Sequence, residues 1–284
     1  MSLINKLISF TFLFCCAGAA LGQATAPAGL LKRTSTKTET RDIGYGGRIT
    51  IVGGPVGSVT IESWNQSSVE VVADLEIQAP TEDDLNRIAA VTGFAINDEM
   101  NAVSIVTTGT HDKAFMKKNA KNFPKKLLGL PWSVNFHIRV PQMCDLDVNI
   151  GKGAFTLTGV EGAMLIKAAE SNANMTLTGG DVIVSVGAGT MTINIPSRGW
   201  RGRGADINLA AGTLNLNLAP SFNAYINGDI LRVGTIENNY PALKPRERTK
   251  ATPTSITGRA GTGGAALNFK LGDGKLTIAE IAKQ

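Results

Sequence analysis

Apolar and polar residues alternate with a period of two along much of the chain. Residues 48–51, 58–62 and 69–77 are the first examples, and turn-forming residues such as Gly53, Gly54 and Pro55 separate them. Alternating runs bounded by glycine, proline or asparagine are typical of β-strands with one buried face. The sequence therefore predicts an all-β protein.

One segment departs from this period. Thr81 precedes Asp84 in a capping-box arrangement, and Leu85 and Ile88 recur at helical spacing up to about Val91. These are the signals of a helix start followed by an amphipathic turn pattern. We expect one short helix in the N-terminal half of the chain, covering an open end or edge of the sheet.

Related runs return in the second half of the chain. Residues 155–159 (FTLTG) resemble residues 175–179 (MTLTG), and residues 191–195 and 214–218 continue the pattern at a spacing of roughly twenty residues. Such a unit is too small to bury its own apolar face, so neighbouring units must stack. The repeats predict a single-domain β-solenoid of parallel β-helix type, on which outward Asn and Thr side chains can form ladders.

The first 22 residues have the pattern of a secretory signal peptide. Lys6 precedes the apolar residues 7–20, and residues 20–22 (ALG) form a small-x-small cleavage site, with residues 24–26 (ATA) as the alternative site. A retained membrane anchor is the other interpretation, although the apolar stretch is short for a bilayer. We predict a signal peptide in residues 1–22, a flexible lead-in in 23–45 and one β-solenoid domain in 46–284. The mature chain would be exported to the periplasm, the cell surface or the medium, with no transmembrane segment after cleavage.

Cysteine content and charge narrow the chemistry only slightly. Cleavage removes Cys15 and Cys16, and the remaining Cys144 cannot form an internal disulfide, so it is interpreted as a buried structural thiol. Lys and Arg number 28 against 23 Asp and Glu, a formal net charge of +5. This mild excess indicates an anionic partner only if it is concentrated in one place.

A lysine-rich insert at residues 111–131 concentrates it. Phe115, Phe123 and Leu128 interleave with its lysines, so the segment could be an amphipathic element that binds anionic lipid, acidic glycan or an envelope protein. The alternative is a surface excursion whose aromatic side chains pack back onto the solenoid. The candidate binding residues are Lys113, Lys117, Lys118, Lys121, Lys125 and Lys126.

Candidate catalytic groups are few. The chain has two histidines, His111 and His137, and no nucleophile elbow, phosphate loop or metal-ligand spacing, so we expect no enzyme activity, cofactor or metal. Asp145 and Asp147 share a strand face and are the one carboxylate pair to weigh for glycoside cleavage, against the simpler interpretation of a solvated face. No nucleic-acid motif accompanies the basic residues.

The order of motifs resembles the bacterial exported "putative adhesin" family. The resemblance rests on residues 57–65 (GSVTIESWN), 138–141 (IRVP), 159–162 (GVEG), 218–224 (LAPSFNA) and 272–278 (GDGKLTI). It implies a β-solenoid in the cell envelope and implies no reaction. Residues 168–174 (AAESNAN) depart from the family pattern, because a Gly-x-Gly turn is usual there.

Together these features predict an exported, non-enzymatic β-repeat protein that offers a surface for adhesion, assembly or binding in the bacterial envelope. The alternatives are a polysaccharide-active enzyme on a β-helix scaffold and a regulatory module that binds anionic envelope components.

Overall fold

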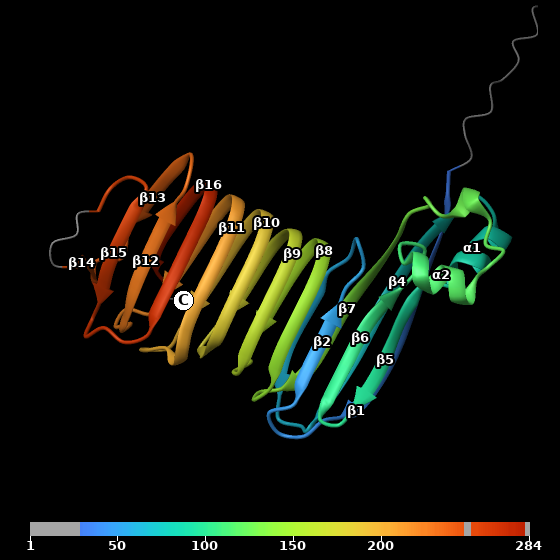
Figure 1. Ribbon diagram of the computed structural model, residues 1–284, viewed down its shortest axis with the longest axis horizontal. Helices are drawn as coiled ribbons and strands as arrows, with labels where there is room; N and C mark the ends of the chain where they lie inside the picture. The colour runs from blue at the N-terminus through green and yellow to red at the C-terminus, as the bar shows by residue number, and fades with distance from the viewer. Residues whose placement is uncertain (1–28, 247–250, 282–284) are drawn as a thin grey trace, which may run out of the picture.

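The computed structural model describes residues 29–246 and 251–281, and the predicted signal peptide lies outside them. Nearly all regular structure in the described part is β-strand, which confirms the predicted class (Figure 1). No helix in that part is long and apolar enough to cross a membrane. The strands are β1 (Leu31–Asp42), β2 (Arg48–Val52), β3 (Val59–Trp64), β4 (Ser68–Ala79), β5 (Gly93–Glu99), β6 (Ala102–Thr108), β7 (Trp132–Pro141), β8 (Asp145–Thr158), β9 (Ala163–Thr176), β10 (Gly179–Ile195), β11 (Arg201–Leu218), β12 (Ala224–Ile230), β13 (Gly234–Asn238), β14 (Leu243–Pro245), β15 (Ser255–Ala260) and β16 (Ala266–Glu280).

The strands form one 16-stranded sheet that is not closed. Its main path runs β1-β4-β7-β3-β8-β9-β10-β11-β16-β12-β15-β14, and β2, β5, β6 and β13 pair beside it. The central part, β8-β9-β10-β11-β16, is entirely parallel, and these long strands bend so that the molecule is an elongated stack of rungs (Figure 1). Each rung therefore touches mainly the rung before it and the rung after it.

The core consists of rows of apolar side chains that repeat from rung to rung. Val148 pairs with Ile166, Ile166 with Val184, Val184 with Ile207 and Ile207 with Phe269, and all five are at most 1% exposed. Alternate residues of a strand point to opposite faces, so the residues between them face solvent. Burial of such rows supplies the main favourable free energy, since no rung could bury its own apolar face alone.

A column of glycines marks the bend of four of the five long strands β8, β9, β10, β11 and β16. Gly212 has φ +138°, and a Cβ built on it would lie 1.8 Å from the carbonyl oxygen of Gly189 in the neighbouring rung. Only glycine permits this approach of backbone to backbone. Ser171 occupies the β9 position of the column, within the segment where the sequence departs from the family pattern, and its buried hydroxyl has no hydrogen-bond partner among the described residues. The glycine column comprises Gly57, Gly153, Gly189, Gly212, Gly274 and Gly234.

The helices lie at the N-terminal end of the stack. The predicted helix is present as α1 (Glu82–Ala89), where the Thr81 hydroxyl accepts a hydrogen bond from the Asp84 backbone N–H at 3.2 Å. The prediction of a single helix is wrong, because α2 (Lys113–Asn119) and the 3₁₀ helix η1 (Lys125–Leu127) form within the lysine-rich insert. Asp112 caps α2, because its carboxylate accepts hydrogen bonds from the backbone N–H groups of Ala114 and Phe115. This cap stabilises the start of a helix that is only seven residues long.

The predicted flexible lead-in is wrong for the residues that form β1. This strand pairs with β4 in antiparallel register from Leu31 opposite Ala79 to Asp42 opposite Ser68. Its side chains are almost all exposed, so the apolar alternation used to find the other strands is absent. Threonine has high strand propensity, and charged side chains suit an edge strand, which explains why a polar sequence is ordered here.

The repeat alignment proposed from the sequence is displaced by two residues at one rung. Leu157, not Phe155, pairs with Met175, and the two runs of a unit belong to one continuous bent strand. Ile193, not Met191, likewise pairs with Met175. The match between residues 191–195 and 214–218 holds, because Met191 pairs with Leu214. A two-residue shift leaves every side chain on the same face, so alternation alone does not distinguish the two registers.

Candidate functional site

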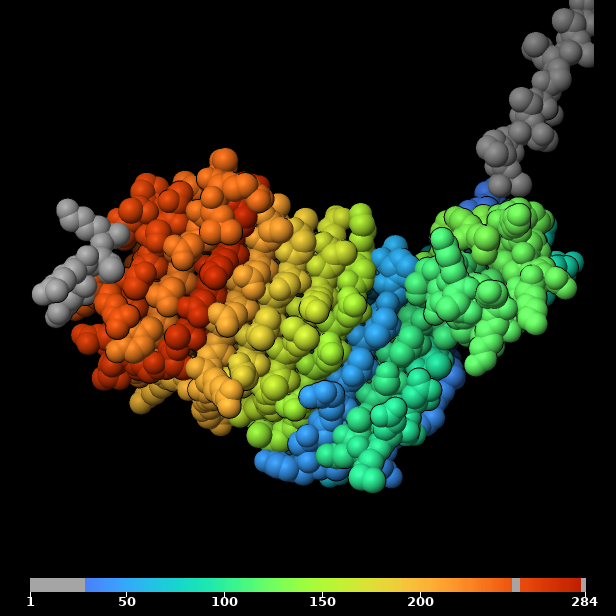
Figure 2. Space-filling view, in the orientation of Figure 1, coloured from blue at the N-terminus to red at the C-terminus, as the bar shows by residue number. Residues whose placement is uncertain are grey.

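The lysine-rich insert is a small folded element attached to one end of the stack. It follows β6 and precedes β7, and Figure 2 shows it in green at the end opposite the red C-terminal strands. Leu127 is 1% exposed and packs with Ile77, Leu85 and Ile88 of β4 and α1, forming an apolar cluster separate from the main core. The insert is therefore held in place by burial.

The insert has features of both interpretations, the amphipathic binding element and the surface excursion that packs back on the scaffold. Phe115 and Phe123 are half-buried, as expected for an excursion that packs back on the scaffold. All six lysines are nevertheless exposed, and Leu128 is 44% exposed. Lys126 forms an ion pair with Asp84 at 3.2 Å. The remaining surface is thus both basic and partly apolar.

An apolar hollow lies within this element. It has a volume of about 440 Å³ and is lined by Met116, Ala120, Phe123 and Leu128, with Lys117 and Lys121 beside them. Lysines beside an apolar recess can bind a ligand that carries an anionic group next to an apolar group. The sequence predicted the lysines and the aromatic residues, whereas the recess depends on how α2 and η1 fold together.

The other basic segments do not join the insert. Arg201 and Arg203 begin β11, where they pair with Glu161 and with Asp181, the latter at 3.8 Å. Lys244 lies in β14, which ends the main path of the sheet opposite β1. Neither segment lies at the N-terminal end of the stack, where the insert is.

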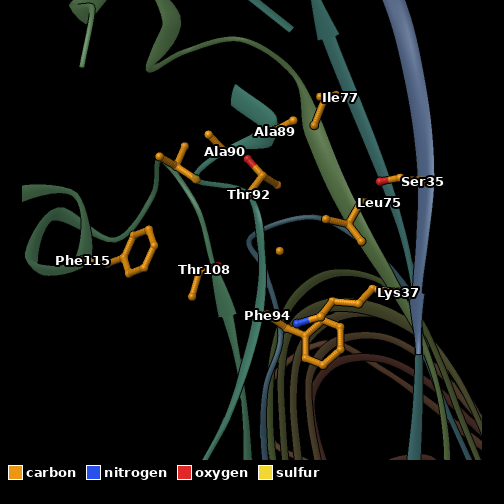
Figure 3. Close-up of a pocket in the computed structure, with 12 residues that line it drawn as sticks. Ser35, Lys37, Leu75, Ile77, Ala89, Ala90, Thr92, Phe94, Thr108 and Phe115 are labelled. Carbon is orange, nitrogen blue, oxygen red and sulfur yellow. The ribbon is translucent and has the colours of Figure 1, made fainter. Parts of the chain in front are cut away.

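A second hollow opens between β1, β4 and β5 beside both helices (Figure 3). It has a volume of about 260 Å³, just below the range of about 300–1,000 Å³ that is typical of small-molecule pockets. Leu75, Phe94 and Phe115 contribute apolar walls, and the Lys37 ammonium lies 4.6 Å from the centre of the Phe94 ring. Lys37 also pairs with Glu39, whose carboxyl pKa is lowered chiefly by its hydrogen bond to Lys37.

The two broad faces of the stack differ in charge. Charged residues such as Asp147, Lys167, Asp181 and Asp206 point outward from one face, which we call the mixed face. The opposite face of β9, β10 and β11 presents only Asn and Thr, and we call it the neutral face. Its residues are Asn172, Asn174, Thr176, Thr190, Thr192, Asn194, Thr213, Asn215 and Asn217.

Side-chain amides on the neutral face form a ladder across the rungs. The Asn194 amide donates to the Asn174 side-chain oxygen at 3.2 Å, and the Asn217 amide donates to the Asn194 side-chain oxygen at 2.8 Å. A corresponding ladder on the mixed face runs from Asn227 through Asn268 to Asp206, with both distances 2.8 Å. The predicted ladders are present. The alternation of residues alone does not predict that the ladder on one face consists only of uncharged residues.

The carboxylate pair is placed on the mixed face. Asp145 and Asp147 line a shallow hollow together with Arg48 and Asp181. Asp145 accepts a hydrogen bond from the Ala163 backbone N–H at 2.9 Å, so one of its oxygens is used to join β8 to β9. This contact favours the interpretation of a solvated structural face.

The remaining candidate groups have structural contacts. His137 is exposed on β7 and lies 3.2 Å from Glu62, while the ring of His111 packs on Trp132, and burial lowers the His111 pKa. Burial raises the pKa of the Cys144 thiol to about 12, as predicted for a structural thiol. Within the described residues, no group of three or more His, Cys, Asp or Glu is arranged to hold a metal ion.

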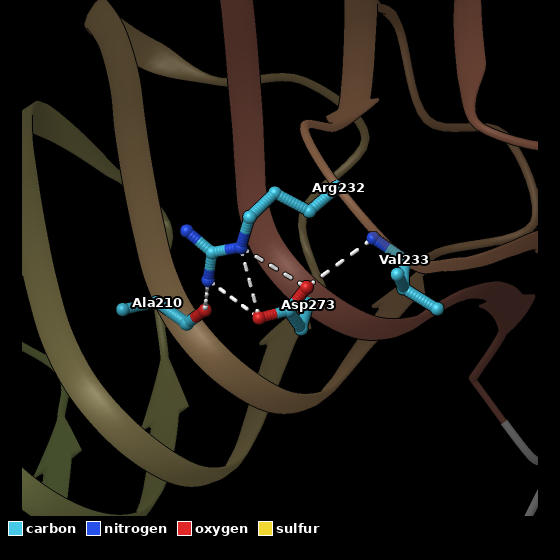
Figure 4. Close-up of polar contacts among 4 residues, drawn as sticks. All are labelled: Ala210, Arg232, Val233 and Asp273. Carbon is cyan, nitrogen blue, oxygen red and sulfur yellow. Dashed lines mark hydrogen bonds and ion pairs between the residues drawn. The ribbon is translucent and has the colours of Figure 1, made fainter.

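One ion pair fastens the bend of a C-terminal rung (Figure 4). Arg232 Nε donates to both carboxylate oxygens of Asp273, at 3.1 and 3.0 Å. Arg232 Nη2 donates to one of these oxygens at 2.5 Å and to the Ala210 carbonyl at 3.3 Å. The Arg232 guanidinium lowers the pKa of the Asp273 carboxyl. Charge-assisted hydrogen bonds of this kind are stronger than those between neutral groups, so the contact ties β16 to the segment after β12.

Comparisons with protein-family models and with curated proteins find no match. Among solved structures, a "putative cell adhesion protein" from Clostridium sporogenes is 10% identical, with 88% of this chain and 100% of that chain covered and a TM-score of 0.49. "Putative adhesin" structures from Bacteroides fragilis and Parabacteroides merdae are each 12% identical, cover 87% and 88% of this chain and 97% of their own, and have TM-scores of 0.25 and 0.28. These names agree with the family resemblance stated from the sequence. With TM-scores below 0.5, none of these three structures superposes closely on this chain.

Proposed function

We propose that this chain is an exported, non-enzymatic β-solenoid that presents its long faces as a surface for adhesion or assembly in the bacterial envelope. The parallel rungs β8-β9-β10-β11-β16, their repeated core rows and the glycine column support the solenoid. The signal pattern in residues 1–22 supports export.

The neutral face is the observation that carries this proposal. Soluble proteins keep their surfaces mixed in charge, and the mixed face of the same strands does so. Nine outward positions on β9, β10 and β11 instead hold only Asn and Thr, at the strand spacing of about 4.8 Å. A rigid, uncharged array of amides and hydroxyls is suited to an extended partner with repeating hydroxyl groups, such as an uncharged glycan.

Binding of the mature chain to an array of envelope glycans tests the proposal. The double variant Thr192→Lys/Asn215→Lys places two charges on paired positions of the neutral face. The control Ser185→Lys/Asn208→Lys places the same charges on paired positions of the same two strands on the mixed face. We expect binding to an uncharged glycan that changes little with salt, is lost in the first variant and is kept in the control.

Three results would overturn this function. Equal loss of binding in both variants, or no glycan binding by the wild-type chain, would remove the neutral face as the adhesive surface. Release of soluble sugar from a polysaccharide, abolished in Asp145→Asn or Asp147→Asn, would show an enzyme instead.

A further inference from the structure

The positive charge of this chain is concentrated in the insert. Six lysines and one aspartate give residues 111–131 a net charge of +5, which equals the formal net charge of the whole chain. The rest of the protein is therefore neutral overall. Among the described residues, Lys126 is the one of the six that pairs with a carboxylate, at Asp84, so five ammonium groups have no such partner in that part of the chain.

We propose that residues 111–131 dock on the surface of a lipid bilayer that contains anionic headgroups. Negatively charged headgroups complement the exposed lysines, and each lysine close to such a surface raises partitioning about fivefold. Leu128 is 44% exposed beside the lysines, so an apolar side chain is available to enter the interfacial region at the same time.

The hollow within the insert distinguishes lipid from acidic glycan as the partner. Its walls are mainly apolar, from Met116, Phe123 and Leu128, and its volume of about 440 Å³ is open to an acyl chain. An acidic glycan would satisfy the lysines and leave these apolar walls in water. A lipid uses both parts, because its anionic headgroup lies next to its acyl chain.

The scaffold holds this surface ready for binding. Leu127 is buried against α1 and β4, and Lys126 reaches Asp84 on α1 at 3.2 Å. Little conformational order has to be gained on docking, which lowers the entropic cost of binding. Because the insert lies at one end of the stack (Figure 2), a membrane bound there leaves the neutral face uncovered. Membrane docking at the insert therefore does not depend on which partner the neutral face binds.

Vesicle flotation tests the inference with residues 23–284. Vesicles of phosphatidylcholine alone are compared with vesicles that also contain phosphatidylglycerol, at salt concentrations of about 0.1 M and about 1 M, between which the screening length falls from about 10 to about 3 Å. We expect binding to the anionic vesicles at the lower salt concentration, little at the higher, and little to phosphatidylcholine alone.

Three variants separate charge, position and apolar contact. Lys117→Gln/Lys121→Gln should lower partitioning about 30-fold, because two lysines are lost beside the hollow. Lys167→Gln/Lys270→Gln removes the same charge from exposed positions on the stack and should change it far less. Leu128→Ser should weaken vesicle binding while leaving binding to heparin, a soluble polyanion, unchanged.

Several outcomes of these vesicle and heparin measurements would overturn the proposal. Equal losses in the two lysine pairs would show general charge attraction and overturn the docking surface. Heparin binding without vesicle binding, or vesicle binding indifferent to Leu128→Ser, would overturn the lipid assignment in favour of an acidic glycan. Failure of glycan binding at the neutral face would leave the vesicle result unaffected, so the two proposals fail separately.

Discussion

Replacement of Gly212 by alanine tests the close stacking of the rungs. Gly212 lies in the glycine column at φ +138°, a region that residues with a Cβ rarely adopt. The added Cβ would be 1.8 Å from the Gly189 carbonyl oxygen and 2.9 Å from the Gly189 carbonyl carbon. Both contacts are to backbone, so no side chain can rotate away to relieve them.

Two costs determine the size of the effect. An L-residue at this φ costs about 1–3 kcal/mol, and the backbone shift needed to admit an extra carbon costs about 1–3 kcal/mol more. The variant should therefore lose about 2–6 kcal/mol of the free energy of unfolding, against a typical total of about 5–15 kcal/mol. With a urea slope of about 3 kcal/mol per M, the midpoint should fall by about 0.7–2 M.

Urea unfolding followed by circular dichroism measures this midpoint. Gly129→Ala is the matched control, because Gly129 has no atom within 4 Å of its added Cβ and is not among the glycines with positive φ. The free energy of unfolding of Gly129→Ala should stay within about 0.5 kcal/mol of the wild-type value. If the two variants unfold at the same urea concentration, the rungs are not packed as closely as described and the reasoning fails.

Three further predictions follow from single side chains. Ser171→Ala removes a buried hydroxyl without a partner among the described residues and should raise the unfolding free energy by about 1 kcal/mol, measured by thermal melting; a loss of stability would indicate that the hydroxyl is paired. Cys144 should resist Ellman's reagent at pH 8 in the native protein and react at once in guanidinium, since burial raises its pKa to about 12; rapid native labelling would contradict its burial. Asp273 has a lowered pKa beside Arg232, so its contribution is present at neutral pH and is lost as the pH falls through the ordinary carboxyl range and then through the lowered pKa. Asp273→Asn should accordingly melt below wild type at pH 7 and together with it in acid, whereas an equal gap at both pH values would assign the effect to something other than this ionisation.

The strands that bury one face could be predicted from the sequence, and the edge strand could not. Alternation at residues such as Ile49, Ile51 and Val71 records burial directly, because these side chains are 0% exposed. β1 has no buried face, so it leaves no apolar alternation. The regular recurrence of threonine at Thr34, Thr36, Thr38 and Thr40 is the available signal, because threonine has a high strand propensity.

The site was predictable in composition but not in shape. The lysines and aromatic residues of the insert are visible in the sequence, whereas the hollow depends on α2, which starts because Asp112 caps it. The neutral face likewise depends on register. Thr192 and Asn215 are distant in the sequence and become neighbours only when β10 and β11 pair, and a two-residue slip would preserve the alternation while changing which residues meet.

The presence of Ser171 at a position where the neighbouring rungs have glycine affects how the stack responds to a pulling force. Hydrogen bonds between rungs run along the long axis of the stack, so a pull between the insert and the C-terminal end would load every interface between rungs in series. Such a series yields first at its weakest link. Ser171 places a buried hydroxyl with no hydrogen-bond partner among the described residues at the position where the neighbouring rungs have glycine. We therefore expect the β9 rung to separate first under load, while the rungs on either side stay folded.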